Sequence, residues 1–123
     1  MTNPLGDARL FFQFSHFESI IDMQKKALLL TQDGRIEPIK PANGKNFTLS
    51  ELKELIGCDW GIEVIYLNNS GTGNDPIMIG DEEARLVSEP VVNPIATKVY
   101  QQSWNTRNDI VGNIVLCTSA MFQ

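Results

Sequence analysis

The sequence predicts an α+β fold, in which a mixed, mainly antiparallel sheet carries two packed helices and an N-terminal amphipathic helix precedes it. Two segments carry helix-capping signals, and several short apolar segments have the composition of strands. The chain has 123 residues, 42% of them hydrophobic, which suits one modest core and not two. We therefore expect an extension over residues 1–22 and a single domain over residues 23–123.

The extension is expected to be a helix because its apolar residues recur at the spacing of one helix face. A strand is the alternative, since Phe12, Phe14 and His16 also alternate. Met23 lies just ahead of the first predicted strand, which begins at residue 27, so we hypothesise that residues 1–22 are an appendage to an already complete domain. The helical stripe consists of Leu10, Phe14, Phe17 and Ile21.

An aromatic group in this extension is a candidate interface. It can fold back onto its own domain or pack on a second copy, which would form a homodimer through this segment. The sequence leaves both arrangements open. The candidate residues are Phe11, Phe12, Phe14 and Phe17.

The domain is expected to begin with a hairpin. Residues 27–31 and 35–39 have strand character, and the Asp33-Gly34 step between them favours a tight turn. Asn43, Lys40 and Lys45 then surround a turn before the first predicted helix. Because a helix N-terminus attracts anions, these three residues form a candidate anion site, although lysines beside a turn commonly serve only solubility.

Residues 49–56 are predicted to be a helix. Thr48 can accept from the amide of Glu51 while the Glu51 side chain reaches back, which is a capping box. Phe47 and Leu52 occupy the positions of a hydrophobic staple. The expected apolar stripe consists of Leu49, Leu52, Leu55 and Ile56.

Three further strands are expected after this helix. Residues 60–67 alternate as a half-buried strand does, and residues 77–79 and 85–87 flank an acidic turn at 81–83. That turn lacks the spaced ligands of a calcium loop, so we interpret it as solvated. Pro76 restricts the strand it begins to an edge or to its first position.

A second helix is predicted to start after Asn93, a good N-cap, with Pro94 at its first position. It is expected to end near Trp104. Residues 110–117 are apolar at nearly every position, which predicts a central strand covered on both faces. Trp60 and Trp104 are expected in the core or an interface, because no basic residues interleave with them for base stacking.

Charge and cysteine content exclude several classes of function. The net charge of −5 argues against binding to duplex nucleic acid, which depends on lysine and arginine. No apolar run approaches the roughly 20 residues of a membrane span. Cys58 and Cys117 are distant in sequence and no export signal is recognised, so a cytoplasmic location is expected.

No catalytic residue, metal site or cofactor is expected. His16 is the single histidine, and it lies in the extension, so a catalytic triad or an ordinary zinc site has too few partners. The sequence therefore predicts a protein that is not an enzyme.

The chain resembles the domain of unknown function 3846 family, small proteins of bacteriophages and bacterial mobile elements. The resemblance implies a cytoplasmic setting and an unidentified host or mobile-element protein as partner, and it implies no reaction. We expect a non-enzymatic interaction or modulator domain, with sequestration of a small anion or nucleotide as the alternative. The resemblance depends on residues 26–30, 40–45, 47–49, 93–97 and 109–117.

Overall fold

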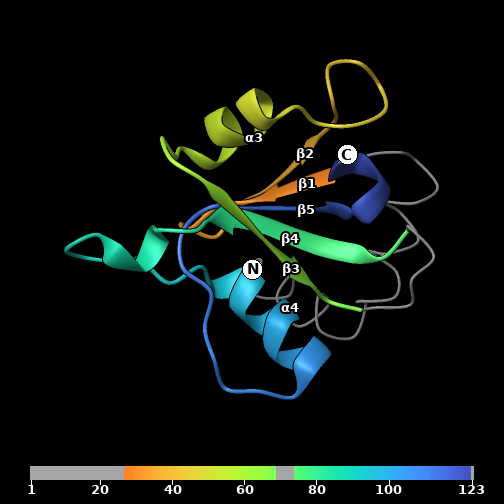
Figure 1. Cartoon of the computed structure of the whole chain (residues 1–123). Helices are drawn as coiled ribbons and strands as arrows, with labels where there is room; N and C mark the ends of the chain where they lie inside the picture. Colours follow the sequence, from red (N-terminus) through yellow and green to blue (C-terminus); the bar gives the residue numbers. More distant parts are fainter. Residues whose placement is uncertain (1–26, 69–73, 123) are drawn as a thin grey trace.

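The computed structural model describes residues 27–68 and 74–122 (Figure 1). The expected N-terminal helix therefore lies outside the described residues. Within them, five strands form one sheet in the order β2-β1-β5-β4-β3. The elements are β1 (Ala27–Leu30), β2 (Ile36–Ile39), α3 (Leu49–Ile56), β3 (Ile62–Tyr66), β4 (Pro76–Asp81), the 3-10 turn η1 (Ala84–Leu86), α4 (Pro94–Trp104), β5 (Ile114–Thr118) and the 3-10 turn η2 (Ser119–Phe122).

Every pair of neighbouring strands in this sheet is antiparallel. The α+β class is confirmed, whereas the expected mixture of parallel and antiparallel pairs is wrong for the described strands. The physical reason lies in the connections. A parallel pair needs a crossover between the two strands, but each neighbouring pair here runs in opposite directions through a hairpin or a longer return.

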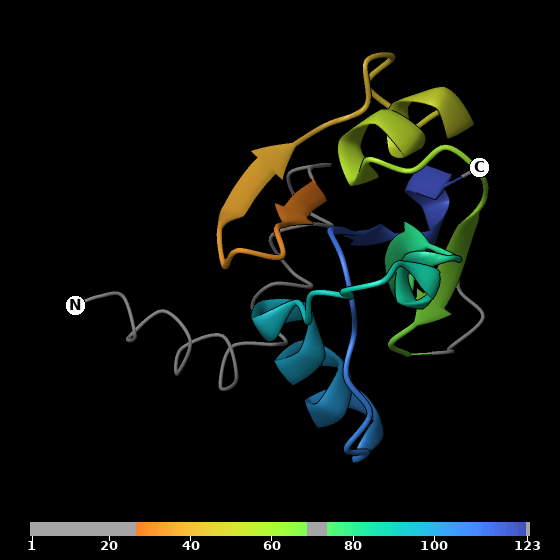
Figure 2. The same ribbon diagram turned by 90° about the vertical axis from the view of Figure 1, so that its left-hand side faces the viewer.

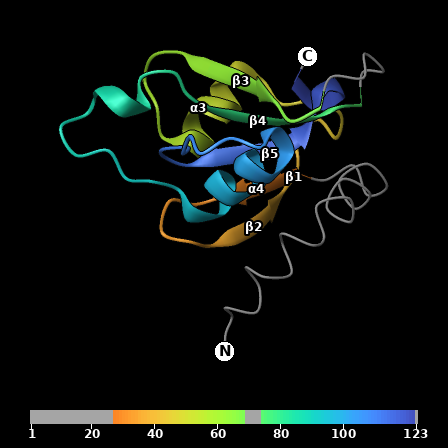
Figure 3. The same cartoon turned by 90° about the horizontal axis from the view of Figure 1, so that it is seen from below.

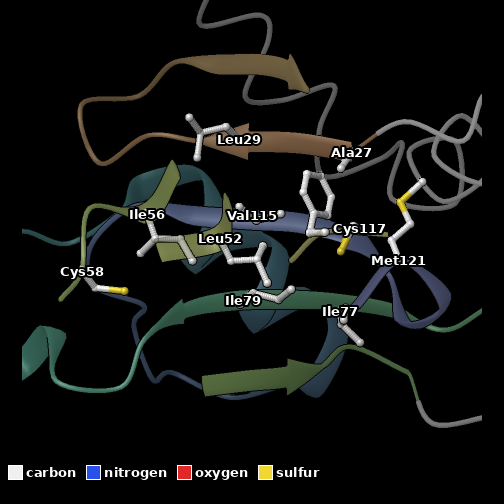
Figure 4. Close-up of a cluster of buried hydrophobic side chains, with 11 residues drawn as sticks. Ala27, Leu29, Leu52, Ile56, Cys58, Ile77, Ile79, Val115, Cys117 and Met121 are labelled. Carbon is white, nitrogen blue, oxygen red and sulfur yellow. The ribbon is translucent and has the colours of Figure 1, made fainter. Parts of the chain in front are cut away.

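The two helices cover opposite faces of the sheet, which makes three layers (Figures 1 and 2). Side chains alternate along β5, so Ile114 and Leu116 join the core on the α4 side while Val115 and Cys117 join the core on the α3 side. All five residues of β5 are buried, which confirms a central strand covered on both faces, although it spans 114–118 and not the predicted 110–117. Figure 4 shows the core on the α3 side, where Leu52 and Ile56 point at the sheet.

Helix α3 begins and ends as its sequence predicts. The Glu51 amide donates to Thr48 Oγ1 at 3.1 Å, and the Glu51 carboxylate accepts from the Thr48 amide at 2.8 Å. Phe47 and Leu52 are both buried, as a hydrophobic staple requires. Gly57 ends the helix with a φ of 83°, a left-handed conformation that glycine adopts without strain.

Helix α4 begins at a buried asparagine that also joins other parts of the fold. Asn93 Oδ1 accepts from the Ala96 amide at 3.0 Å, which caps the helix. Its Nδ2 donates to the carbonyls of Leu30 and Gly112, each at 2.8 Å. One side chain therefore connects α4, the end of β1 and the approach to β5.

Residues 85–87 do not form the predicted strand. The Glu83 amide donates to Asp81 Oδ1 at 2.9 Å, and the Leu86 amide donates to the Glu83 carbonyl at 2.9 Å. These bonds close a turn and the 3-10 helix η1, so the chain leaves the sheet where β4 ends. Pro76 is the first residue of β4, as its missing N–H predicts.

Neither tryptophan lies in the core. Trp60 is 71% exposed, and Trp104 is also exposed while its Nε1 donates to the Tyr66 carbonyl at 2.7 Å. Of the two alternatives expected for them, core or interface, the core is therefore wrong, and the interface stays a prediction. Trp60 precedes β3, an edge strand, and Trp104 ends α4, so neither has a packed layer above it.

Candidate functional site

The three residues of the predicted anion site lie on or beside one exposed turn before α3. Asn43 Oδ1 accepts from the amides of Lys45 at 2.8 Å and Asn46 at 2.9 Å, and its Nδ2 donates to Asn46 Oδ1 at 2.9 Å. Lys40 and Lys45 are both exposed. Asn43 therefore uses its side chain to shape the turn.

The N-terminus of α3 already holds a carboxylate from its own chain. Glu51 Oε1 accepts from the Thr48 amide and Oε2 accepts from the Ala42 amide, both at 2.8 Å. The bonds from Thr48 and then Ala42 lower the pKa of Glu51 below its ordinary value of 4.5. An external anion would have to compete with this internal one for the same amides.

A Glu51→Gln variant is expected to reduce the acid sensitivity of the fold. Because the folded-state pKa lies below 4.5, ionised Glu51 stabilises the fold above pH 4.5, and this contribution is lost as pH falls through the folded-state pKa. Thermal unfolding measured at about pH 6 and about pH 3 should show a smaller fall in Tm for Glu51→Gln than for the parent chain. Glu54→Gln removes the same charge from an exposed position of α3 and serves as the control. An equal fall in all three proteins would contradict the assignment.

The aromatic interface candidates Phe11, Phe12, Phe14 and Phe17 lie outside the described residues, as does His16. Both cysteines are free and buried. Burial raises the pKa of the Cys117 thiol to about 12, and burial, followed by the nearby Asp81, raises that of Cys58. Both thiols are thus protonated at neutral pH and are poor nucleophiles.

A cavity of about 670 Å³ lies on the α4 face of the sheet, and no local sequence pattern indicates it. Helix α4 lies mainly over β5 and β1 (Figure 3), and toward β3 the cavity is lined by residues 84–86 and 107–111 of two loops. The floor of the cavity includes Glu63, Ile65, Gly80 and Ile114, and Tyr100 contributes to its wall. The cavity therefore lies where the covering layer changes from helix to loop.

Two segments far apart in sequence meet across this cavity. The Arg85 guanidinium donates to the Asp109 carbonyl at 2.5 Å and pairs with the carboxylate of the same residue. Glu82 lies over Gly61, because a Cβ built on that glycine would come within 1.9 Å of Glu82 Oε1. Residue 61 must therefore be glycine for Glu82 to keep this position.

An apolar segment, residues 84–92, projects from the end of the sheet that carries the cavity (Figures 1 and 3). We call it the projecting segment. Leu86 is 77% exposed, and three valines of this segment are also exposed. The segment is held at its far end, where Val92 bridges to Val111 and the Gly112 amide donates to the Val91 carbonyl at 3.0 Å. Trp60 lies at the same end, beside Gly61, whose carbonyl accepts from the Glu82 amide at 3.2 Å. The exposed valines are Val87, Val91 and Val92.

The apolar residues of the projecting segment were visible in the sequence, but their pattern was interpreted as part of a strand. The acidic turn at 81–83 is present as expected, but its bonds at Asp81 and Glu83 lead into η1 and away from the sheet, and not into a further strand. Within residues 27–68 and 74–122, no group of three or more histidine, cysteine, aspartate or glutamate side chains is placed to hold a metal ion. Every helix in that part of the chain is too short or too polar to cross a membrane.

Comparison with known proteins adds no further assignment: no family model, no curated protein and no solved structure matches the chain. The resemblance to the domain of unknown function 3846 family stays a prediction. Arguments about function therefore depend on the geometry of this chain.

Proposed function

We propose that the chain is a non-enzymatic interaction domain that binds another protein through the projecting segment and Trp60. The observation that carries this proposal is the concentration of large exposed apolar side chains at one end of the sheet, led by Leu86 at 77% and Trp60 at 71% exposure. Contiguous apolar surface on a folded domain is typical of a protein contact. Tryptophan is also enriched among the residues that contribute most to such contacts.

The geometry of the projecting segment favours binding at low entropic cost. It is fixed at its start by the η1 turn, through the Leu86 amide and the Glu83 carbonyl, and at its end by the Val92–Val111 bridge. A segment held at both ends loses less conformational freedom on binding than a free chain does. More of the free energy gained by burying its apolar side chains against a partner therefore remains as binding affinity.

The partner we propose is an unidentified host or mobile-element protein that has an apolar contact surface. We propose that the two proteins bind in the cytoplasm. This setting follows from the resemblance to the phage and mobile-element family and from the expected location. The expected contact through the aromatic extension is a separate proposal, because those residues are not described.

The test is affinity capture from cells of the source organism with the parent chain and a Leu86→Asp/Val91→Asp variant. Both residues are exposed, so the variant should fold, which circular dichroism checks. A specific partner should be retained by the parent chain and weakened at least about tenfold by the variant. A Leu49→Asp/Ser50→Asp variant adds the same two charges at exposed positions of α3 and should keep the partner. Equal retention by all three proteins would contradict the proposed surface.

Sequestration of a small anion or nucleotide receives less support. Lys40 and Lys45 are exposed and available, but Glu51 occupies the amides of Thr48 and Ala42. The attraction of the α3 N-terminus for an external anion is correspondingly reduced.

A further inference from the structure

The cavity on the α4 face has the size of a small-molecule site and a distinct chemical character. Its volume of about 670 Å³ lies within the range of roughly 300–1,000 Å³ common for such sites. Gly80 contributes no side chain to the floor, and a Cβ there would come within 2.7 Å of Ile114 Cδ1. Ile114 therefore lies close over the backbone of β4, and the space beside it stays open.

Carboxylates outnumber guanidinium groups around this cavity. Four acidic residues line it, Glu63, Asp81, Glu82 and Asp109, against the two arginines Arg85 and Arg107. Asp109 is neutralised by its ion pair with Arg85. Three carboxylates then remain against one guanidinium, which favours a positively charged occupant.

Glu63 is the carboxylate that stands on the strand floor of the cavity, beside Ile65 of the same strand. It stands on the floor opposite Gly80 in the β3–β4 register, and its side-chain carboxylate forms no hydrogen bond or ion pair with another described residue. By contrast, Asp81 accepts from the Glu83 amide at 2.9 Å. Glu63 thus keeps both oxygens available to a ligand.

The other residues that line the cavity are suited to the apolar part of an organic ligand. Ile65, Ile110 and Ile114 supply apolar surface, and the Tyr100 ring can face a cation. A bare metal ion fits less well, because no three ligating side chains among the described residues converge for one. The occupant indicated is an amine or guanidinium joined to an apolar group.

We propose that this cavity binds an organic cation, with Glu63 as its principal carboxylate and Tyr100 and the isoleucines around its apolar body. Leu86 lines this cavity and also belongs to the proposed protein contact, so the two sites adjoin, but Glu63 and Tyr100 lie outside the projecting segment. A free amine or an arginine side chain of a peptide would present the same chemistry. The experiment therefore includes one compound of each kind.

The test is a titration of the ¹⁵N-labelled chain followed by ¹H–¹⁵N NMR at physiological salt, with phenethylammonium chloride and acetyl-Leu-Arg-Leu-amide as ligands. At least one should give saturable shifts centred on the amides of Ile65, Gly80 and Ile110. Phenylacetate, the matched anion, should give none there. The compound whose shifts saturate shows whether the cation is a free amine or the arginine side chain of a peptide.

Two variants separate a local site from general attraction to an acidic protein. Glu63→Gln should weaken binding by about three- to fivefold, the effect of one partly exposed ion pair. Glu54→Gln makes the same charge change on α3, across the sheet, and should change binding by less than about 1.5-fold. Absence of saturation with both cations, equal shifts with phenylacetate, or equal weakening by both variants would overturn the proposal.

Discussion

An Asn93→Ala variant is expected to lose about 3 kcal/mol of the free energy of unfolding. Asn93 is fully buried, and its side chain makes hydrogen bonds to Ala96, Leu30 and Gly112. The change removes the N-cap of α4, worth about 1 kcal/mol, and leaves two carbonyls without their donor. Because the three partners belong to different parts of the fold, the loss should affect the whole domain.

Urea denaturation measures this loss, and two further variants divide it. Asn93→Ser keeps a capping oxygen but no amide donor, so it should recover only the capping part. Asn108→Ala deletes the same side chain from an exposed position and should cost less than about 0.5 kcal/mol. A loss below about 1 kcal/mol for Asn93→Ala would show that the three hydrogen bonds are not cooperating.

Leu52→Ala is expected to be destabilising by about 3 kcal/mol. Leu52 is 1% exposed and packs in the core on the α3 side, where it forms the staple with Phe47. Truncation removes apolar contacts and leaves a cavity that the close-packed surroundings fill only in part.

Leu49→Ala is the matched control for this effect. Leu49 belongs to the same helix and is 54% exposed, so its truncation should change the free energy of unfolding by less than about 0.5 kcal/mol. Both values come from the same denaturation experiment. Similar values for the two variants would contradict the assignment of the α3 face.

The helices could be predicted from sequence because their signals are local. Thr48 and Glu51 form the capping box, and Asn93 with Pro94 marks the start of α4, so both boundaries needed only neighbouring residues. The exposed position of Leu49 could not be predicted in this way. A residue at the end of a helix's apolar stripe is buried only if the sheet extends beneath it. The local sequence does not show where the sheet ends.

The arrangement of layers and the candidate sites depend on contacts between distant segments. β5 is the last strand in the chain and lies at the centre of the sheet, and no local pattern carries that order or the face that each helix covers. The cavity likewise needs Arg85 to reach Asp109, 24 residues away. Residues 85–87 have the composition of a strand, and only the turn at Asp81 and Glu83 directs them out of the sheet.

Hydrogen–deuterium exchange on the captured complex is the most direct test of the proposed function. With the partner bound, backbone amides in the projecting segment and next to Trp60 should exchange more slowly than in the free chain. Amides of α3 around Leu49, on the other face of the sheet, should exchange at an unchanged rate. Protection confined to α3 or β2, with the projecting segment unchanged, would contradict the assignment of residues 84–92 as the binding surface.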